Sequence, residues 1–140
     1  MVSIPTKTKF NAVKVEYDGR KFDSKLECNV YKVLKERLVP YGFHIGFQPL
    51  FILQDKFRFE GHIIRPITYK ADFLIYKGSP DTDIGVFNKY AIIDATGMEP
   101  PDFKLKRKLF IKFHGYDILI LKSMKQANLW CDYFLWYFNQ

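Results

Sequence analysis

Apolar and polar positions alternate along much of the chain, with longer segments of helical spacing between them. The alternation on either side of Asp18-Gly19 predicts two short strands, because this dipeptide favours the turn that joins antiparallel strands. Alternation returns over residues 45–78, which predicts a strand, a turn and two further strands, the last in the buried segment ADFLIY. A Gly-, Pro- and Asp-rich loop follows. The next segment, KYAIIDAT at residues 89–96, is apolar almost throughout, so we expect a central strand there.

Three segments show the apolar spacing of helices. The first is KLECNVYKVLKERL, residues 25–38, with Asp23 or Ser24 as its N-cap and with Pro40 and Gly42 beyond its end. Glu27 lies beside the apolar stripe of this helix, so we expect it at the edge of the buried face.

The second helix is predicted in PPDFKLKRKLFIKFHG, with Asp102 as its cap and Gly115 as its stop. The segment YDILIL then returns to strand character, and a strand that follows a helix crossover is expected to be parallel to the strand before it. The last segment, residues 123–140, carries aromatic side chains around most of its circumference. Such a helix is expected to be covered on more than one side.

These elements predict a single α/β domain over residues 1–140. Its mixed sheet is flanked by helices, with an N-terminal hairpin at one end of the chain and an aromatic helix at the other. Residues 1–9 are expected to form a flexible basic arm.

Composition and charge add a class of partner. The chain has 140 residues, 48% of them hydrophobic and 18% aromatic, which is enough for one compact core. Its net charge is +7 and its pI is near 9.3. This excess favours polyanionic partners, with nucleic acid first and an acidic membrane surface second.

The cysteines and the N-terminal sequence bear on location. Cys28 and Cys131 have neither the spacing nor the histidine neighbours of a zinc site. The start MVSIPTKTKF has no apolar segment typical of a signal peptide, and no segment is long enough to span a membrane. We therefore expect a cytoplasmic protein, in the host cytoplasm if a phage encodes it.

Three acidic residues stand where a hydrolytic metal site would use them: Glu27 on the first helix, Asp72 entering one strand and Asp94 ending another. Magnesium prefers oxygen ligands, so Asp72 and Asp94 with the backbone carbonyl of Ala95 are sufficient to bind it. Each acid also has an ordinary interpretation. A helix glutamate is commonly exposed, and an aspartate before Gly97 is common in turns.

The order of these acids and of the basic helix after them resembles the PD-(D/E)XK nuclease superfamily. More closely, YDGRKFDSKLE, RPITYKADFLIY, IDATG and DFKLKRKLF are similar to segments of small phage-type endonucleases related to Holliday junction resolvases. The similarity runs from about Lys14 to about Leu121.

That resemblance implies a restriction-endonuclease-like fold and a structure-selective DNA endonuclease that acts in phage DNA recombination or processing. It implies Mg²⁺ as the cofactor, with Mn²⁺ as a possible substitute, branched DNA as the substrate and a homodimer as the assembly. Carried over residue by residue, it places Glu27, Asp72 and Asp94 in the acidic catalytic set.

Thr96 stands where the family pattern has a lysine, and a hydroxyl cannot replace an ammonium group in electrostatic stabilisation. Lys104 is our first choice for the missing charge, because it is nearest the loop that leaves Asp94. The alternative is that the helix lysines only bind DNA phosphates, in a catalytically inactive DNA-binding or regulatory module. A third possibility is a basic protein whose partner is another protein. The residues predicted to contact nucleic acid are Lys25, Arg65, Lys70, Lys106 and Lys108.

Overall fold

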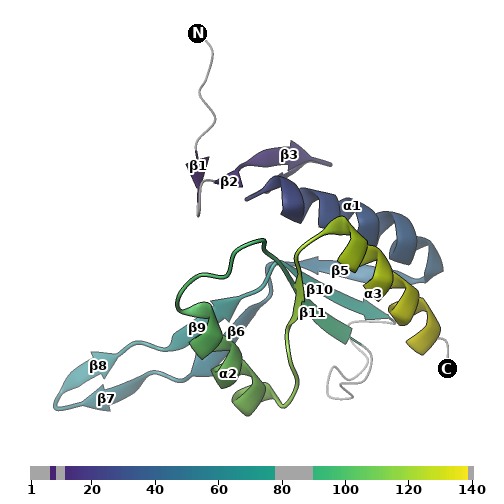
Figure 1. Ribbon diagram of the computed structural model, residues 1–140. Coiled ribbons are helices and arrows are strands. Elements are labelled where there is room, and N and C mark those ends of the chain that lie inside the picture. The colour runs from purple at the N-terminus through teal and green to yellow at the C-terminus, as the bar shows by residue number, and fades with distance from the viewer. Residues whose placement is uncertain (1–6, 9–11, 78–89, 139–140) are drawn as a thin grey trace, which may run out of the picture.

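The computed structural model describes residues 7–8, 12–77 and 90–138 (Figure 1). Their elements, in chain order, are β1 (Lys7–Thr8), β2 (Ala12–Val13), β3 (Val15–Tyr17), β4 (Arg20–Phe22), α1 (Lys25–Leu38), the 3-10 helix η2 (Val39–Tyr41), β5 (Phe43–Phe47), β6 (Leu50–Gln54), β7 (Phe57–Phe59), β8 (His62–Ile64), β9 (Ile67–Lys70), β10 (Phe73–Lys77), β11 (Tyr90–Ala95), α2 (Phe103–His114), β12 (Leu119–Leu121) and α3 (Met124–Tyr137).

The predicted N-terminal hairpin is confirmed. β3 and β4 pair antiparallel across Asp18 and Gly19, whose φ angles of 56° and 72° are both positive, as a two-residue hairpin turn of this type requires. The expected flexible arm at residues 1–9 is corrected in part. Lys7 and Thr8 form β1 and pair with Val13 and Ala12, while the rest of that arm lies outside the described residues.

The first helix begins where the sequence predicts. Ser24 is its N-cap, and the Ser24 hydroxyl accepts a hydrogen bond of 3.0 Å from the backbone N–H of Glu27. At the other end the chain continues into η2, and Gly42 closes that turn with a φ of 88°. The stop signals Pro40 and Gly42 therefore act one turn beyond the end of α1.

A four-stranded sheet in the order β12-β11-β10-β5 forms the centre of the described fold. β10 is antiparallel to both of its neighbours, β5 and β11. β11 and β12 are parallel and are joined through α2, as the crossover predicts. The strand that contains Asp94 is therefore central, which confirms the expectation from its apolar sequence. The loop predicted before it, residues 78–88, lies outside the described residues.

Each face of the sheet carries its own hydrophobic cluster, and the two clusters belong to different helices. α1 and α3 lie together over one face, and α2 packs near β6 and β9 (Figure 1). The α1–α3 cluster includes Phe22, Leu34, Phe73, Ile75, Ile93 and Phe134, all buried. The α2 cluster includes Leu53, Tyr69, Ile92, Phe103, Phe110 and Ile118, also buried.

The second helix ends at Gly115, with a φ of 81°, as predicted. Asp102 takes the N-cap position but makes no capping hydrogen bond with its side chain. It lies 3.5 Å from Lys106, one turn into the helix, so its carboxylate forms an ion pair where a backbone cap was expected.

The prediction that the last helix is covered on more than one side is confirmed only in part: α3 packs on α1 and on β12, and its outer face remains exposed. Ala127, Cys131 and Phe134 are buried and form one stripe against α1. Leu129 and Trp136 remain 59% and 61% exposed. The reason is that α1 is the described element that packs most extensively on α3, so one stripe is covered and the outer rings remain at the surface.

The strands β6 to β9 continue beyond the central sheet. β6 pairs with β9, and beyond them β7 and β8 form a hairpin that projects away from the body (Figure 1). The sequence predicted a turn at Glu60-Gly61, and these residues have positive φ angles of 48° and 78°. The predicted single strands on either side of it are each divided in two. No helix among the described residues is long and apolar enough to cross a membrane.

Candidate carboxylate site

Asp72 and Asp94 meet where β10 begins and β11 ends. The antiparallel register pairs Phe73 with Ile93 and Leu74 with Ile92, which brings Asp72, just before β10, close to Asp94 near the end of β11. The Asp72 N–H donates to the carbonyl of Ile93 at 3.2 Å, one residue out of this register, so the regular pairing of the two strands ends at Phe73 and Ile93. The Ala95 N–H donates a 2.8 Å hydrogen bond to Asp72 Oδ2, and the Asp72 carboxyl group forms a side-chain hydrogen bond with Asp94. The two carboxyl groups are therefore neighbours.

The environment of Asp72 disfavours its charged form. Burial raises its pKa from 3.8 to about 9, with further contributions from the negative charges of Asp94 and Glu27 and from a side-chain hydrogen bond with Asp94. The backbone N–H of Ala95 opposes this shift, because it donates a 2.8 Å hydrogen bond to Asp72 Oδ2. This environment therefore favours the protonated form of Asp72 when no cation is near.

Glu27 belongs to the same site, although it comes from the opposite layer. Its residue is 6% exposed, and its charge contributes to the raised pKa of Asp72. The Ser24 cap fixes the first turn of α1, and this turn carries Glu27 toward the strand ends. The ordinary interpretation, an exposed helix glutamate, is wrong, because the side chain lies at the buried edge of the helix.

Tyr69 is a site residue that sequence reasoning missed. Its hydroxyl donates a 2.5 Å hydrogen bond to Asp94 Oδ2, and the residue is 6% exposed. The ring lies edge-on to Phe103 and Phe110 of α2, at centroid distances of 6.0 and 6.1 Å. Burial and the adjacent carboxylates raise the pKa of Tyr69, so its hydroxyl keeps its proton and remains a donor.

The available donors fit a hard divalent cation in their chemistry. Asp72 and Asp94 offer carboxylate oxygens from adjacent strands, and Mg²⁺ is commonly held by one or two carboxylates while it keeps several waters. A cation would also replace the proton that Asp72 otherwise holds. Among the described residues, no group of three or more His, Cys, Asp or Glu side chains could hold a metal ion. Metal ligation by Asp72, Asp94 and the carbonyl of Ala95 stays a prediction.

Thr96 follows β11 and turns away from the pair of acids. Its hydroxyl donates a 2.7 Å hydrogen bond to the carbonyl of Met98, and its N–H donates to the carbonyl of Leu121. The Thr96 side chain therefore helps to shape the turn that leads to α2.

The predicted basic residues lie on several elements. Lys104 and Lys108 are exposed and form no ion pair among the described residues, whereas Lys106 pairs with Asp102. On the other elements, Lys25 opens α1, Lys70 ends β9 two positions before Asp72, and Arg65 lies between β8 and β9; all three are exposed. Their contacts with a substrate stay predictions.

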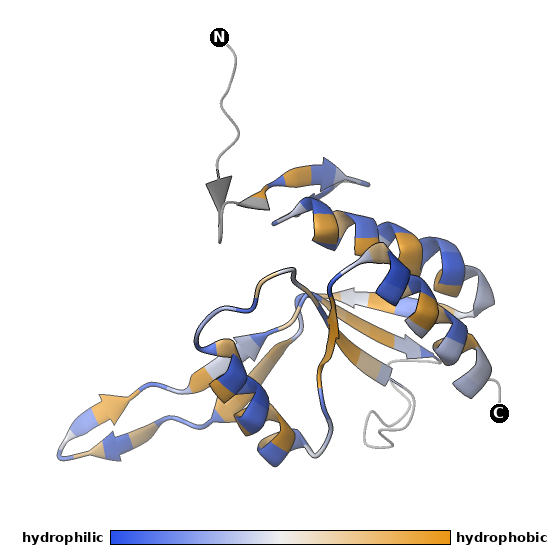
Figure 2. Ribbon diagram, in the orientation of Figure 1, coloured by the Kyte–Doolittle hydropathy of each residue, from blue (hydrophilic) through white to orange (hydrophobic). Residues whose placement is uncertain are grey.

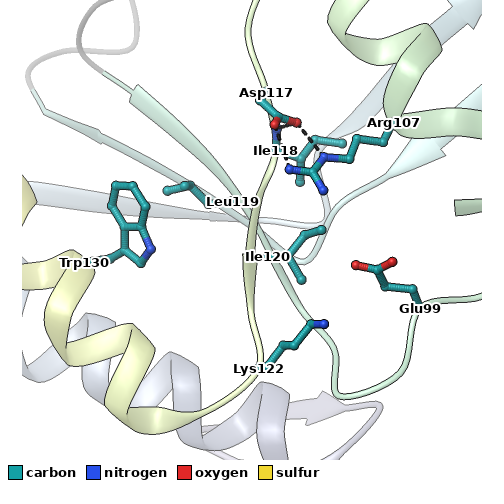
Figure 3. Close-up of a pocket in the computed structure, with 8 residues that line it drawn as sticks. All are labelled: Glu99, Arg107, Asp117, Ile118, Leu119, Ile120, Lys122 and Trp130. Carbon is teal, nitrogen blue, oxygen red and sulfur yellow. Dashed lines mark hydrogen bonds and ion pairs between the residues drawn. The ribbon is translucent and has the colours of Figure 1, made fainter. Parts of the chain in front are cut away.

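A separate pocket of about 440 Å³ lies along β12, between α2 and α3 (Figure 3). Arg107 and Asp117 face each other at one end of it in a two-hydrogen-bond pair of 2.8 and 2.7 Å. Glu99, Lys122 and Trp130 line the rest, together with residues of the strand. None of the predicted site residues lines this pocket, so the carboxylate site is the stronger candidate for chemistry.

The fold and the site together define the class of protein: a mixed α/β domain with a partly buried carboxylate pair at the ends of two neighbouring strands. The family model described as "Protein of unknown function (DUF1064)" matches residues 7–128, and the chain belongs to this family. No curated protein and no solved structure matches the chain significantly.

Proposed function

We propose that the protein is a metal-dependent DNA endonuclease that hydrolyses phosphodiester bonds in branched DNA, with Mg²⁺ as its metal and Mn²⁺ as a substitute. The observation that carries the proposal is the meeting of Asp72 and Asp94, whose carboxyl groups are hydrogen-bonded, beside Glu27. Carboxylates this close repel each other unless a proton or a cation lies between them. A net charge of +7 favours a polyanionic substrate.

The finer fold is part of the same proposal. The resemblance implies a restriction-endonuclease-like sheet, and the observed strand order is compatible with it. The supporting features are the central position of β11, the parallel β11–β12 pair across α2 and the acids at the strand ends.

Each residue has a distinct role in the proposed reaction. Asp72 and Asp94 hold the metal, with the Ala95 carbonyl as a further ligand, and Glu27 completes the acidic set. The metal, when bound, supplies Lewis acidity and lowers the pKa of a bound water. Lys104 or a neighbouring lysine supplies positive charge near the phosphate in place of Thr96. Lys25, Arg65, Lys70, Lys106 and Lys108 hold the DNA backbone.

A homodimer is the proposed assembly, because a four-way junction offers two equivalent cleavage points. The exposed outer face of α3 is the surface we propose for it. Leu129, Tyr133 and Trp136 are 59%, 45% and 61% exposed there, and aromatic residues are enriched in protein interfaces.

The second candidate is a catalytically silent DNA-binding or regulatory module on the same fold. One observation favours it: the Thr96 hydroxyl is used in the turn with Met98, so it is not directed at a phosphate. In this case the carboxylates persist without the positive charge that the reaction needs.

Cleavage of a labelled four-way junction and of a linear duplex in MgCl₂ or MnCl₂ separates the two candidates. Asp94→Asn abolishes metal-dependent cutting if the protein is the enzyme. Glu36→Gln is the matched control, because it removes an exposed carboxylate on α1 and should leave cutting unchanged.

The silent module gives a different pattern. Wild-type protein then binds the junction without cutting it, and Thr96→Lys introduces cutting. If wild-type and Thr96→Lys proteins neither bind nor cut DNA, both candidates are wrong and a protein partner becomes the leading explanation for the positive charge.

A further inference from the structure

The hairpin of β7 and β8, together with the residues that flank it, forms an arm over residues 55–66. Within the part of the chain that the structure describes, neither strand pairs with a further strand at its outer edge. All six residues of the two strands are exposed, and the tight Glu60-Gly61 turn closes its tip. Figure 1 shows the arm projecting beyond α2, and Figure 2 shows hydrophobic residues on both of its strands. An isolated two-stranded hairpin is at best marginally stable in water, so the arm is expected to function against a partner.

The register divides the arm into an apolar face and a basic face. Phe57 pairs with Ile64 and Phe59 pairs with His62, so these four side chains share one face. Phe57 and Phe59 are 46% and 61% exposed there.

On the other face, Arg58 pairs with Ile63. Continuation of the register by one pair sets Lys56 opposite Arg65 on this same face. Like charges directly opposite each other are destabilising, and none of these three cations forms an ion pair among the described residues. The acids of the arm lie elsewhere: Asp55 alternates to the apolar side and Glu60 lies in the turn. The net charge of the arm is therefore +1, from three cations and two acids, with the cations together on one face.

We propose that this arm is a DNA-binding ribbon that lies in a groove of the duplex arm next to the cleavage point. The proposal rests on the endonuclease function proposed above. A groove of B-DNA admits a two-stranded ribbon. In that position Lys56, Arg58 and Arg65 meet phosphates, while Phe57 and Phe59 contact sugars or a base step, as apolar side chains of groove-binding ribbons do.

A second copy of the chain is the competing partner, and the size of the apolar face argues against it. Phe57, Phe59 and Ile64 are its exposed large hydrophobic residues. Stable protein interfaces bury about 800 Å² on each partner, from about 20–30 residues. Such a dimer would also leave the facing cations Lys56 and Arg65 without counter-charges.

The connection of the arm to the site predicts where it contacts DNA. Seven residues lead from Arg65 to Asp72 and thirteen from Phe59 to Asp72, which in extended chain is at most about 23 and 43 Å. At about 3.4 Å per base pair, the arm reaches DNA no more than about 7–13 base pairs from the scissile phosphate. A duplex arm that ends before the contact point is expected to lose the contact.

The test compares Lys56→Ala/Arg58→Ala with the control Lys14→Ala/Lys125→Ala, which removes the same charge from exposed sites outside the arm. Fluorescence anisotropy in CaCl₂ measures the Kd for junctions with duplex arms of about 20 and about 6 base pairs over a series of salt concentrations. Each lost phosphate contact lowers the slope of log Kd against log salt by about 0.9, so the arm variant should lose about 1.8 on the long junction. On the short junction it should match wild-type protein. An unchanged slope on the long junction, or an equal loss in the control, overturns the proposal.

Phe59→Ser tests the apolar face without a change in charge. It should weaken binding to the long junction with the salt slope retained. Circular dichroism should show unchanged unfolding for all arm variants, because the arm is exposed. If Phe59→Ser instead halves the mass in sedimentation equilibrium, the arm is a protein interface and the proposal is wrong.

Hydrolysis of bis(p-nitrophenyl) phosphate with Mn²⁺ separates failure of the arm from failure of the enzyme. This small diester cannot reach the arm, so arm variants should hydrolyse it at the wild-type rate, and Asp94→Asn should not hydrolyse it. If wild-type protein is inactive on the diester and on junction DNA, the nuclease proposal fails. The salt slopes still decide whether the arm binds DNA.

Discussion

At the scale of single residues, the site combines charges that the sequence identifies with a neutral donor that it does not. The three acids were predicted from their order and from the resemblance, and the raised pKa of Asp72 shows that they affect one another electrostatically. Tyr69 was missed because a tyrosine in an alternating strand normally indicates core packing. A partial signal exists, since Tyr69 stands three positions before Asp72 on the chain segment that enters the site.

The raised pKa of Asp72 predicts a pH-dependent stability. Between pH 4 and 9 the folded protein holds a proton on Asp72 that the unfolded chain has released, so without metal this residue makes stability fall as pH rises through that window. Asp72→Asn removes the penalty and should raise the Tm at pH 8 above that of wild-type protein, with little difference near pH 4. Thermal unfolding in EDTA at the two pH values measures this. A lower Tm for Asp72→Asn at pH 8 would contradict the prediction.

Added metal should reverse the order of the two Tm values at pH 8, so that wild-type protein becomes more stable than Asp72→Asn. Mg²⁺ or Mn²⁺ displaces the proton, so it should raise the Tm of wild-type protein more at pH 8 than at pH 6. The Tm of Asp72→Asn should respond little. Equal shifts in the two proteins would place the metal elsewhere.

Tyr69 should act as a positioning residue for Asp94. Tyr69→Phe keeps the ring contacts with Phe103 and Phe110 but removes the hydrogen bond to Asp94 Oδ2, and loss of such a supporting partner costs about 10–100-fold in metal affinity or activity. The measurements are the Mn²⁺ titration and the kcat and KM for junction cleavage. Tyr90→Phe is the control, because it removes the hydrogen bond between Tyr90 and Tyr116 (2.8 Å). A fall in Tm of the same size in both variants, with unchanged Mn²⁺ affinity, would reduce Tyr69 to a packing residue.

At the scale of elements, the sequence is most informative where local chemistry determines the backbone. The Asp18-Gly19 turn, the Ser24 cap and the Gly115 stop all depend on near neighbours, and all three are confirmed. Residues 45–78 were less well predicted. The alternation of apolar and polar residues continues through the arm, although the pairing of the strands changes at Asp55 and Pro66. Pairing between strands that are distant in the sequence leaves no local pattern from which this change could be predicted.

Two serine caps allow a matched test of how α1 serves the site. Ser24→Ala and Ser123→Ala each remove one cap, from α1 and α3, and each should lower the free energy of unfolding by about 1 kcal/mol. Only Ser24→Ala should also slow cleavage, because the turn it loosens carries Glu27. Urea unfolding and the cleavage rate are the measurements. Similar effects of the two caps on cleavage would show that Glu27 needs no fixed first turn.

At the scale of the whole molecule, the site lies where two separately packed layers meet. The α1–α3 cluster contributes Glu27, and the α2 cluster contributes Tyr69, while the sheet between them contributes Asp72 and Asp94. The parallel crossover was predictable because handed connections restrict where a strand can return. The cover of α3 was not, because aromatic composition does not distinguish a core partner within the chain from a partner outside it.

The outer face of α3 carries the prediction for assembly. If it is the dimer surface, Leu129→Ser/Trp136→Ser should convert the protein to a monomer without a large loss of fold, because both side chains are about 60% exposed. Sedimentation equilibrium measures the mass, and Ile63→Ser on the arm is the control for the loss of an exposed apolar residue. A wild-type monomer at micromolar concentration would remove the proposed dimer.

The two cysteines make the opening of the packing between α1 and α3 measurable as a rate. Cys28 and Cys131 are free and are 1% and 0% exposed on these two helices, and burial raises the pKa of Cys131 to about 11. An alkylating reagent can modify them only when the helices separate, so the rate of modification reports how often this layer opens. If metal at the carboxylate site fixes the position of Glu27 on α1, it should slow alkylation of Cys131 on the neighbouring helix α3.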